Sequence, residues 1–379
     1  MRQLYLAATG MNRGKTTVAL GLFAAIVARG HRTGFIKPVG QRYAVVDGTP
    51  ADEDAILMKA TFDLPDQLDE MSPVHIPRGF TRAYIEGRVT ADLPGRIREA
   101  HAQVAAGREV LVVEGTGHAG VGAVVGLSNA TVARMLGARA LVVSEGGVGR
   151  PIDEIVLNAA LFEKEGVEVV GAVVNKVDLD AQPDLPAIIG RGLAHHGVRL
   201  LGVLPYRPLL SNPTLAMLAE QLEGEVLVRG PTLEVVIEHV LIGAMQPHHL
   251  LERVRRGTLV IAPGDREDAI MASVTRRLVG PPRGSAPGSA AAPPSPPNDS
   301  IVGLVLTGGY RPGPRVLEAI RHADLFALLV RADTYQAASA VHDLLVKTHP
   351  ADTEKIELIK ALVAEHLDVD RLLDLFATA

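Results

Sequence analysis

Short apolar runs alternate with longer stretches of helical periodicity along residues 1–210, and this alternation dominates the pattern of the chain. Short apolar runs predict buried strands, here at Leu4–Ala8, Phe35–Gly40, Val110–Glu114, Ala138–Val143, Val167–Val174 and Leu200–Leu204. Helical segments are expected between them, at residues 18–23, 124–136 and 151–163. Strands that alternate with helices indicate an α/β fold with a doubly wound, mainly parallel sheet.

A second, smaller α/β unit is expected over residues 224–379, after a connector at 211–223 that begins with a capped helix. Its predicted strands are Leu233–Val240, Thr258–Ile261 and Ser300–Leu306, and its predicted helices lie near 268–278, 315–322, 334–345 and 352–366. Residues 280–299 consist almost entirely of Pro, Ser, Ala and Gly. Because such a segment buries too little apolar surface to fold, we expect it to be disordered or to form an excursion on the surface.

The composition of the chain excludes several classes of protein, mainly because the sequence contains no Cys and no basic cluster. The 379 residues are 47% hydrophobic and 21% charged, which suits a globular protein of two domains, or of two domains and a third small one. The absence of Cys excludes disulfides, thiolate zinc sites and cysteine nucleophiles. The formal net charge is −5, and no basic cluster suits a nucleic acid. The chain enters a strand without a signal sequence and its apolar runs are short, so we expect a cytoplasmic protein that does not enter a membrane.

The loop after the first predicted strand carries the strongest chemical signal. It reads TGMNRGKTT from Thr9 to Thr17 and precedes a helix, as a phosphate-binding P-loop does. In such a loop, backbone N–H groups and the positive end of the helix surround phosphate. Lys15 then reaches the β- and γ-phosphates, and the Thr16 hydroxyl binds Mg²⁺.

The loop departs from the pattern G-x-x-x-x-G-K-[ST], because Thr9 stands at the first glycine and Gly10 follows one place later. A chance G-K-T at an ordinary strand–helix turn is the alternative interpretation. We predict nucleotide binding, and the predicted binding residues are Gly10, Met11, Asn12, Arg13, Gly14, Lys15, Thr16, Thr17 and Asn175.

Three charged residues downstream are candidates to complete the site. Lys37 ends a predicted parallel strand, where open α/β sheets bind ligands, although it can also be an ordinary exposed lysine. Asp54 follows Asp52 and Glu53 at a helix start, where acidic residues can bind Mg²⁺ or simply complement the helix dipole. Glu114 directly follows an apolar strand, the Walker-B position for Mg²⁺, or is a carboxylate held by turn N–H groups.

Asn175 begins the sequence Asn175-Lys176-Val177-Asp178 at the end of another apolar strand. The pattern N-K-x-D reads guanine in many GTPases, but Glu114-Gly115-Thr116-Gly117 stands where a GTPase has its D-x-x-G switch. We therefore predict that Asn175 contacts the base and leave the base open. In the second unit, the loops 263–268 and 307–309 suit either anion-binding turns or ordinary helix capping.

These motifs together resemble a known pair of domains. The first part of the chain resembles the dethiobiotin-synthetase-like P-loop domain, through the P-loop, Lys37-Pro38-Val39, Asp54-Ala55, Val113-Glu114-Gly115 and Asn175. The remainder resembles the DRTGG domain that follows such a domain in the N-terminal region of long phosphate acetyltransferases. The matching residues are 263–268, 304–309 and 347–350.

The resemblance implies a role for each matching residue. It implies that Lys37 contacts a substrate and its carbamate, and that Thr16, Asp54 and Glu114 surround Mg²⁺ while Asn175 contacts the adenine of ATP. It names Lys15 and Lys37 as the catalytic candidates. The family's serine after K-P-V-A is Gln41 here, and Asp265-Arg266 is followed by Glu267-Asp268 rather than by T-G-G.

Three functional hypotheses follow. The first is an ATP–Mg²⁺-binding, nucleotide-sensing or regulatory module, since no acyltransferase domain follows and acetyl transfer by this chain alone is not expected. The second is an ATP-dependent ligase or synthase that forms a carbamoyl or acyl phosphate with a small carboxylate or amine. The third, a GTPase switch, is the weakest. We expect no nucleic acid or membrane partner, and we expect the protein to form a homodimer.

Overall fold

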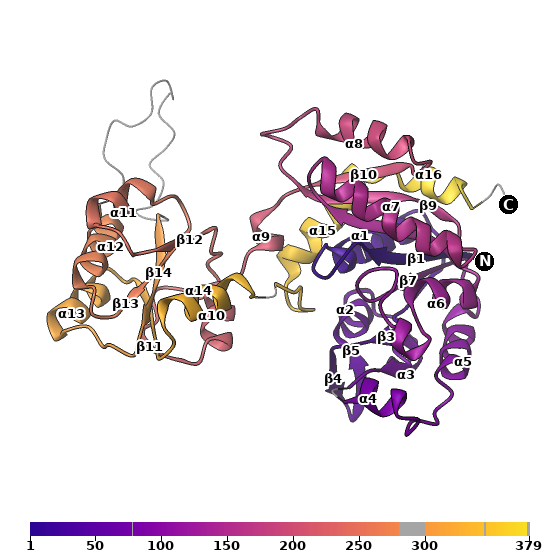
Figure 1. Ribbon diagram of the computed structural model, residues 1–379, viewed down its shortest axis with the longest axis horizontal. Coiled ribbons are helices and arrows are strands. Elements are labelled where there is room, and N and C mark those ends of the chain that lie inside the picture. Colours follow the sequence, from indigo (N-terminus) through magenta and orange to yellow (C-terminus); the bar gives the residue numbers. More distant parts are fainter. Residues whose placement is uncertain (78, 280–299, 345, 377–379) are drawn as a thin grey trace. The chain divides into compact units, whose positions relative to one another are not determined.

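The computed structural model describes residues 1–77, 79–279, 300–344 and 346–376. It divides into two compact units (Figure 1). Unit 1 contains Met1–Arg207 and Thr348–Ala379, and unit 2 contains Pro208–Lys347, so that unit 2 is inserted within the sequence of unit 1. The segment 280–299, predicted to be disordered, lies outside the described residues. None of the helices in the described ranges is long and apolar enough to cross a membrane.

Unit 1 is built on a six-stranded parallel sheet with the order β10-β9-β8-β1-β7-β2. This confirms the doubly wound α/β fold of P-loop NTPase type. The strands are β1 (Arg2–Ala8), β2 (Thr33–Ile36), β7 (Val110–Glu114), β8 (Arg139–Glu145), β9 (Val169–Val177) and β10 (Leu200–Pro205). β2 and β7 are buried along their whole length and the other four strands along most of it, as expected of strands covered on both faces.

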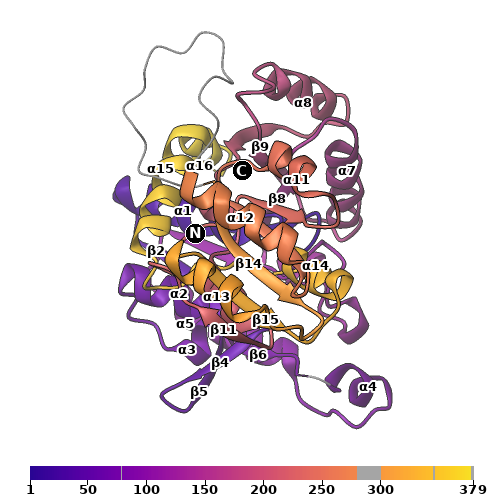
Figure 2. The same cartoon turned by 90° about the vertical axis from the view of Figure 1, so that its left-hand side faces the viewer.

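Helices cover both faces of this sheet (Figure 2). One face carries α7 (Gly149–Lys164) and α8 (Leu185–Ala194), and the other carries α1 (Lys15–Ala28), α15 (Thr353–His366) and α16 (Val369–Asp374). The sequence of α1, KTTVALGLFAAIVA, has no polar face, and residues 18–23, 25 and 26 are buried. A helix stretch that is apolar all round must be covered both by the sheet and on its outer side, and for residues 18–26 α15 supplies the cover opposite the sheet.

Among the remaining elements of unit 1, the helices α2 (Glu53–Phe62), α3 (Leu68–Met71) and α5 (Leu93–Ala105) contact β2. The predicted strand 35–40 is broken at the carboxyl end of β2, because Pro38 has no N–H to donate to a sheet ladder. Beyond the break, β3 (Val39–Gly40) pairs with β6 (Val74–His75) in a separate small sheet. The others are β4 (Tyr43–Val46), β5 (Thr49–Asp52), α4 (Phe80–Ile85), η1 (Ala123–Val125) and α6 (Asn129–Leu136).

Unit 2 has a five-stranded sheet with the order β11-β15-β14-β13-β12, in which β11 alone is antiparallel. Its strands are β11 (Gly224–Val228), β12 (His239–Ile242), β13 (Thr258–Pro263), β14 (Ile301–Thr307) and β15 (Phe326–Val330). One core lies under α11 (Pro247–Arg253), α12 (Glu267–Val279) and α13 (Pro314–His322). The other lies under α10 (Leu215–Gln221) and α14 (Thr334–His342), while α9 (Pro208–Ser211) precedes α10.

The predicted domain boundaries differ from these units in two places. The helix predicted near 352–366 was expected in a second domain of 224–379, but residues from Thr348 onward belong to unit 1, where they cover α1. The expected connector 211–223 contains α10, whose Leu215 and Leu218 are buried in the core of unit 2. The first unit therefore ends at Arg207, close to the predicted 210, and then resumes.

The strands of unit 2 were also predicted incompletely. The strand expected at Leu233–Val240 forms later, as β12, and β11 and β15 were not expected. The strands expected from Thr258 and Ser300 are present as β13 and β14.

The assignment of α15 to unit 1 can be tested with Ile359→Ala, because Ile359 is buried in α15. Truncating a buried Ile costs about 2–5 kcal/mol of unfolding free energy, and we expect the loss in unit 1. Urea unfolding followed by amide exchange in β1 and in β14 measures the two units separately. Leu157→Ala, at a side chain that is 72% exposed, is the control. Destabilisation of unit 2 instead would contradict the assignment.

Candidate active site

The P-loop joins β1 to α1 through backbone conformations that its sequence permits. Asn12 and Gly14 have positive φ angles of 58° and 88°, and Gly14 caps the helix. A Cβ atom on Gly14 would lie 1.9 Å from Nδ2 of Asn175. Position 14 therefore requires glycine both for its left-handed backbone and for the close approach of Asn175.

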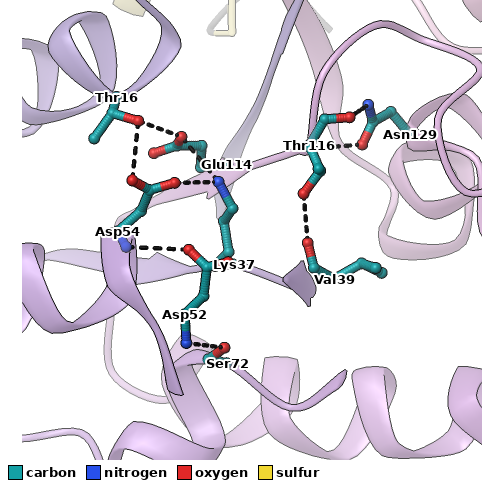
Figure 3. A network of polar contacts seen from close by, with 9 residues as sticks. All are labelled: Thr16, Lys37, Val39, Asp52, Asp54, Ser72, Glu114, Thr116 and Asn129. Carbon is teal, nitrogen blue, oxygen red and sulfur yellow. Dashed lines mark hydrogen bonds and ion pairs between the residues drawn. The ribbon is translucent and has the colours of Figure 1, made fainter. Parts of the chain in front are cut away.

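Four of the predicted residues meet at the start of α1 (Figure 3). The Thr16 hydroxyl lies 3.1 Å from Oδ1 of Asp54 and 2.9 Å from Oε1 of Glu114. The Lys37 ammonium donates to Oδ2 of Asp54 at 2.5 Å and to Oε1 of Glu114 at 3.1 Å. These four side chains form one contact network, which we call the charged cluster.

The fold explains why the charged cluster forms. β1, β7 and β2 are neighbouring parallel strands, so the residues at their carboxyl ends meet at one edge of the sheet. Asp54 is oriented from α2, where the Asp52 carboxylate caps the helix by accepting a hydrogen bond from the Asp54 N–H at 3.0 Å. The Asp52 N–H in turn donates to the Ser72 hydroxyl oxygen. The alternative roles for Lys37 and Glu114, an exposed lysine and a carboxylate held by turn N–H groups, do not describe these contacts.

The charges of the cluster are strongly coupled because Lys37 and Glu114 are buried, with side chains 4% and 0% exposed. Burial alone lowers the pKa of Lys37, but the Asp54 and Glu114 carboxylates raise it well above its usual value. Burial works against the charged form of Asp54, yet the ammonium of Lys37 holds the pKa of Asp54 below its usual range. Burial and the charge of Asp54 raise the pKa of Glu114.

Lys15, the first residue of α1, has a lowered pKa, because burial and the positive charge of Lys37 both disfavour a second ammonium. An anion that entered beside the two lysines would relieve this repulsion.

The oxygen atoms of the cluster suit Mg²⁺. Thr16 has one hydroxyl proton and therefore cannot donate to both carboxylates at once. Oε2 of Glu114 is buried and has no hydrogen-bond partner among the described residues. Mg²⁺ is commonly held by one or two carboxylates together with phosphate oxygens and water, and Thr16, Asp54 and Glu114 match that set. Within the described ranges, no group of three or more His, Asp or Glu side chains forms a larger metal site.

Two residues at the end of β9, Asn175 and Lys176, hydrogen-bond to the backbone of the P-loop. Asn175 is 7% exposed, and its Nδ2 donates to the Arg13 carbonyl oxygen at 3.3 Å. The Lys176 ammonium donates to the Asn12 carbonyl oxygen at 2.8 Å. The Arg13 side chain forms ion pairs with Glu145 and Glu154. Asn175 thus contacts the predicted nucleotide-binding loop itself, and its contact with a base stays a prediction.

The Asp178 carboxylate is held in a contact within its own loop, whereas an aspartate that reads guanine must face the base. It is exposed, and its Oδ1 accepts a hydrogen bond from the Ala181 N–H at 3.0 Å, which closes a turn after β9. This capping role accounts for the carboxylate without a base. The N-K-x-D sequence therefore does not by itself indicate guanine.

A second polar network beside the cluster was not predicted from sequence (Figure 3). Asn129 accepts hydrogen bonds from the Tyr5 hydroxyl and the Thr116 N–H, and donates to the carbonyl oxygens of Thr116 and His118. The Thr116 hydroxyl donates to the Val39 carbonyl oxygen at 2.6 Å. This network ties the loop after Glu114 to the segment after Lys37. The signal in the sequence was a polar residue, Asn129, at the start of a helix whose other buried residues are apolar.

In unit 2, the two loops considered for anion binding make internal contacts. The Glu267 carboxylate accepts a hydrogen bond from the Gly313 N–H, and Arg266 pairs with Asp268. The N–H groups of Gly308 and Gly309 donate to carbonyl oxygens of residues 332 and 330. These contacts favour turn formation and helix capping.

Family comparisons agree with the fold and with the P-loop. A family model described as an AAA domain matches residues 2–214, which is more than half of the chain. The chain belongs to this family. A DRTGG domain model matches residues 217–344, directly after the AAA domain. The resemblance to a dethiobiotin-synthetase-like P-loop domain followed by a DRTGG domain is thereby confirmed.

Curated relatives of this chain include phosphate acetyltransferases. The one from Pseudomonas putida is 28% identical over 97% of this chain and 51% of its own length, and the one from Nitratidesulfovibrio vulgaris is 26% identical with the same coverage. The chain thus spans about half the length of the curated relatives it matches. Among solved structures, the cell division ATPase MinD of Pyrococcus furiosus covers 55% of the chain and 86% of its own length, at 18% identity and a TM-score of 0.35. An AAA domain with a P-loop followed by a DRTGG domain supports a nucleotide-binding regulatory module.

The Thr116 network can be tested with Thr116→Val, which keeps the shape of the side chain and removes its hydroxyl. The buried Val39 carbonyl oxygen would lose this donor, so we expect unit 1 to lose about 1–3 kcal/mol of unfolding free energy. Thr116→Ser keeps the hydroxyl and should retain most of that stability in urea unfolding. Unchanged stability of Thr116→Val would show that this hydrogen bond does not stabilise unit 1, and a loss confined to Thr116→Ser would assign the stability to the methyl group.

Proposed function

We propose that this chain is an ATP–Mg²⁺-binding regulatory module. The observation that carries the proposal is the charged cluster, in which Thr16 at the start of α1 directly contacts Asp54 and Glu114. Thr16, Asp54 and Glu114 would hold Mg²⁺, which supplies positive charge to the phosphates when bound. Lys15 would contact the β- and γ-phosphates, and the loop 10–14 would surround them with N–H groups.

ATP is proposed rather than GTP because of the surroundings of Asp178. Guanine readout by N-K-x-D would require that carboxylate to face the base, whereas it caps a turn through the Ala181 N–H. Asn175 alone remains beside the loop, and a single amide suits adenine as well as guanine. This argument disfavours the GTPase hypothesis.

A sensing role is proposed because of what lies next to the P-loop domain. The curated relatives extend to about twice the length that this chain matches. In a protein of that length, a nucleotide-binding region linked to a DRTGG domain can regulate an activity in the part that the match does not cover. A homodimer stays part of this proposal.

Isothermal titration tests ATP binding. The wild-type protein should bind ATP with Mg²⁺ more tightly than with EDTA, and ATP should displace GTP. In Lys15→Ala the affinity should fall at least about tenfold, because a hydrogen bond to a charged group contributes about 1.5–3 kcal/mol. Lys164→Ala, at an exposed lysine in the last turn of α7, is the matched control. Absence of ATP binding by wild type, or unchanged binding by Lys15→Ala, would refute the proposal.

A ligase or synthase of the dethiobiotin type is the second candidate, and the position of Lys37 favours it. Its ammonium contacts both proposed metal-binding carboxylates, so it would lie close to the transferred phosphoryl group. A substrate carboxylate oxygen would attack the γ-phosphorus, and the bond from that phosphorus to the bridging oxygen of ADP would break. Lys37 would stabilise the negative charge that moves between them.

This second candidate predicts ADP release that a small carboxylate or amine stimulates. Lys37→Ala should abolish the stimulated release, because the ammonium that stabilises the transferred group is lost. A coupled ADP assay over a panel of carboxylates and amines, with and without bicarbonate, measures it. Lys59→Ala, which removes a lysine whose ammonium donates to the backbone carbonyl oxygens of Leu64 and Asp66, is the control. No stimulation by any compound of the panel would count against a ligase.

A further inference from the structure

Helix α15 is the element through which the chain returns from unit 2 to unit 1. Unit 2 ends at Lys347 and α15 begins at Thr353. Within unit 1, α15 and α16 pack on α1 and on β10, the strand from which the chain leaves unit 1. Both ends of the inserted unit therefore join neighbouring elements of unit 1.

The contact between α15 and α1 is unusually close. A Cβ atom on Gly21 of α1 would lie 2.3 Å from Cγ2 of Val363 and 3.0 Å from the Ile359 carbonyl oxygen. Val363 and Ile359 are both buried. Because the Val363 side chain packs directly on the backbone of α1 at Gly21, a displacement of α15 is transmitted to that backbone, since close-packed interiors do not deform continuously.

The far end of α15 is fixed to unit 1 by polar contacts. Leu367 forms an antiparallel bridge with Gly202, and the Asp368 N–H donates to the Leu201 carbonyl oxygen at 2.9 Å. The Arg29 guanidinium donates to both carboxylate oxygens of Asp370, at 2.6 and 2.9 Å. α15 is thus anchored at its carboxyl end, while its amino end is joined to unit 2.

The other partner in the contact, α1, begins with the phosphate-binding residues. Lys15 and Thr16 form its first turn, and Gly21 lies about 9 Å further along the helix axis at 1.5 Å per residue. We propose that α15 couples the P-loop to unit 2, so that nucleotide at the start of α1 changes the stability of α15 and of the chain that leads into unit 2. This inference rests on the proposed ATP binding and adds a route of regulation to it.

Amide exchange measured by mass spectrometry on the full chain, with and without ATP and Mg²⁺, tests the coupling. In wild type we expect ATP to slow exchange in residues 15–28 and also in 353–366, the latter about fivefold or more, the lower end of typical coupling between sites. Residues 185–194 of α8, on the opposite face of the sheet, should not respond.

Gly21→Ala separates the two effects, because its methyl group would displace Val363. The P-loop should still respond to ATP in this variant, while the response of α15 is lost. Gly190→Ala is the matched control, since a Cβ there meets only Leu200, at 3.6 Å, and both responses should remain. If Gly21→Ala fails to fold, Val363→Ala removes the same contact without a clash and should weaken the α15 response.

The outcomes distinguish the two proposals. Slower exchange at the P-loop with unchanged exchange in α15 of wild type would overturn the coupling and leave ATP binding intact. A persistent α15 response in both Gly21→Ala and Val363→Ala would also overturn it. No response in either segment of wild type would overturn the coupling and the proposed ATP binding together.

Discussion

The need to cover both the sheet side and the outer side of α1 along residues 18–26 governs much of unit 1. This helix has no polar face, so the sheet alone cannot shield it from water. The crossovers after β7, β8 and β9 put their helices on the opposite face, because βαβ connections are right-handed. The cover therefore comes from α15 and α16, far along the chain. The same helix begins with Lys15 and Thr16, and its burial holds the P-loop on a rigid support.

At the start of α1, the structure is stabilised by the arrangement of charges more than by hydrophobic packing. A buried ammonium between two carboxylates is stable only while all three groups are present, and removing one partner of a buried ion pair typically costs about 3–5 kcal/mol. Lys37 therefore has two roles that are hard to separate: it neutralises Asp54 and Glu114, and it presents positive charge where phosphate is proposed to bind. A divalent cation could take over the first role and release Lys37 for the second.

Sequence reasoning found the features that depend on local pattern. The apolar runs predicted the strands of the parallel sheet, and spacing at strand ends identified Thr16, Lys37, Asp54 and Glu114, which the fold brings into contact. It did not predict that α15 belongs to unit 1, because the sequence of a helix does not specify which surface the helix covers. It did not find the Asn129 network, because a buried Asn and an exposed one look alike in sequence. The absent polar face of α1 was a usable signal that a second cover existed.

The inserted position of unit 2 has a consequence for how the protein is made. Unit 2 is continuous in sequence and can fold as soon as it leaves the ribosome, whereas unit 1 is incomplete until residues after Thr348 have been synthesised. At about 5–20 residues per second, synthesis of unit 2 delays that moment by on the order of ten seconds. During this time the outward face of α1, bearing the contact surface around Gly21, is uncovered. The first half of the chain therefore keeps an apolar helix face without its cover until α15 has been synthesised.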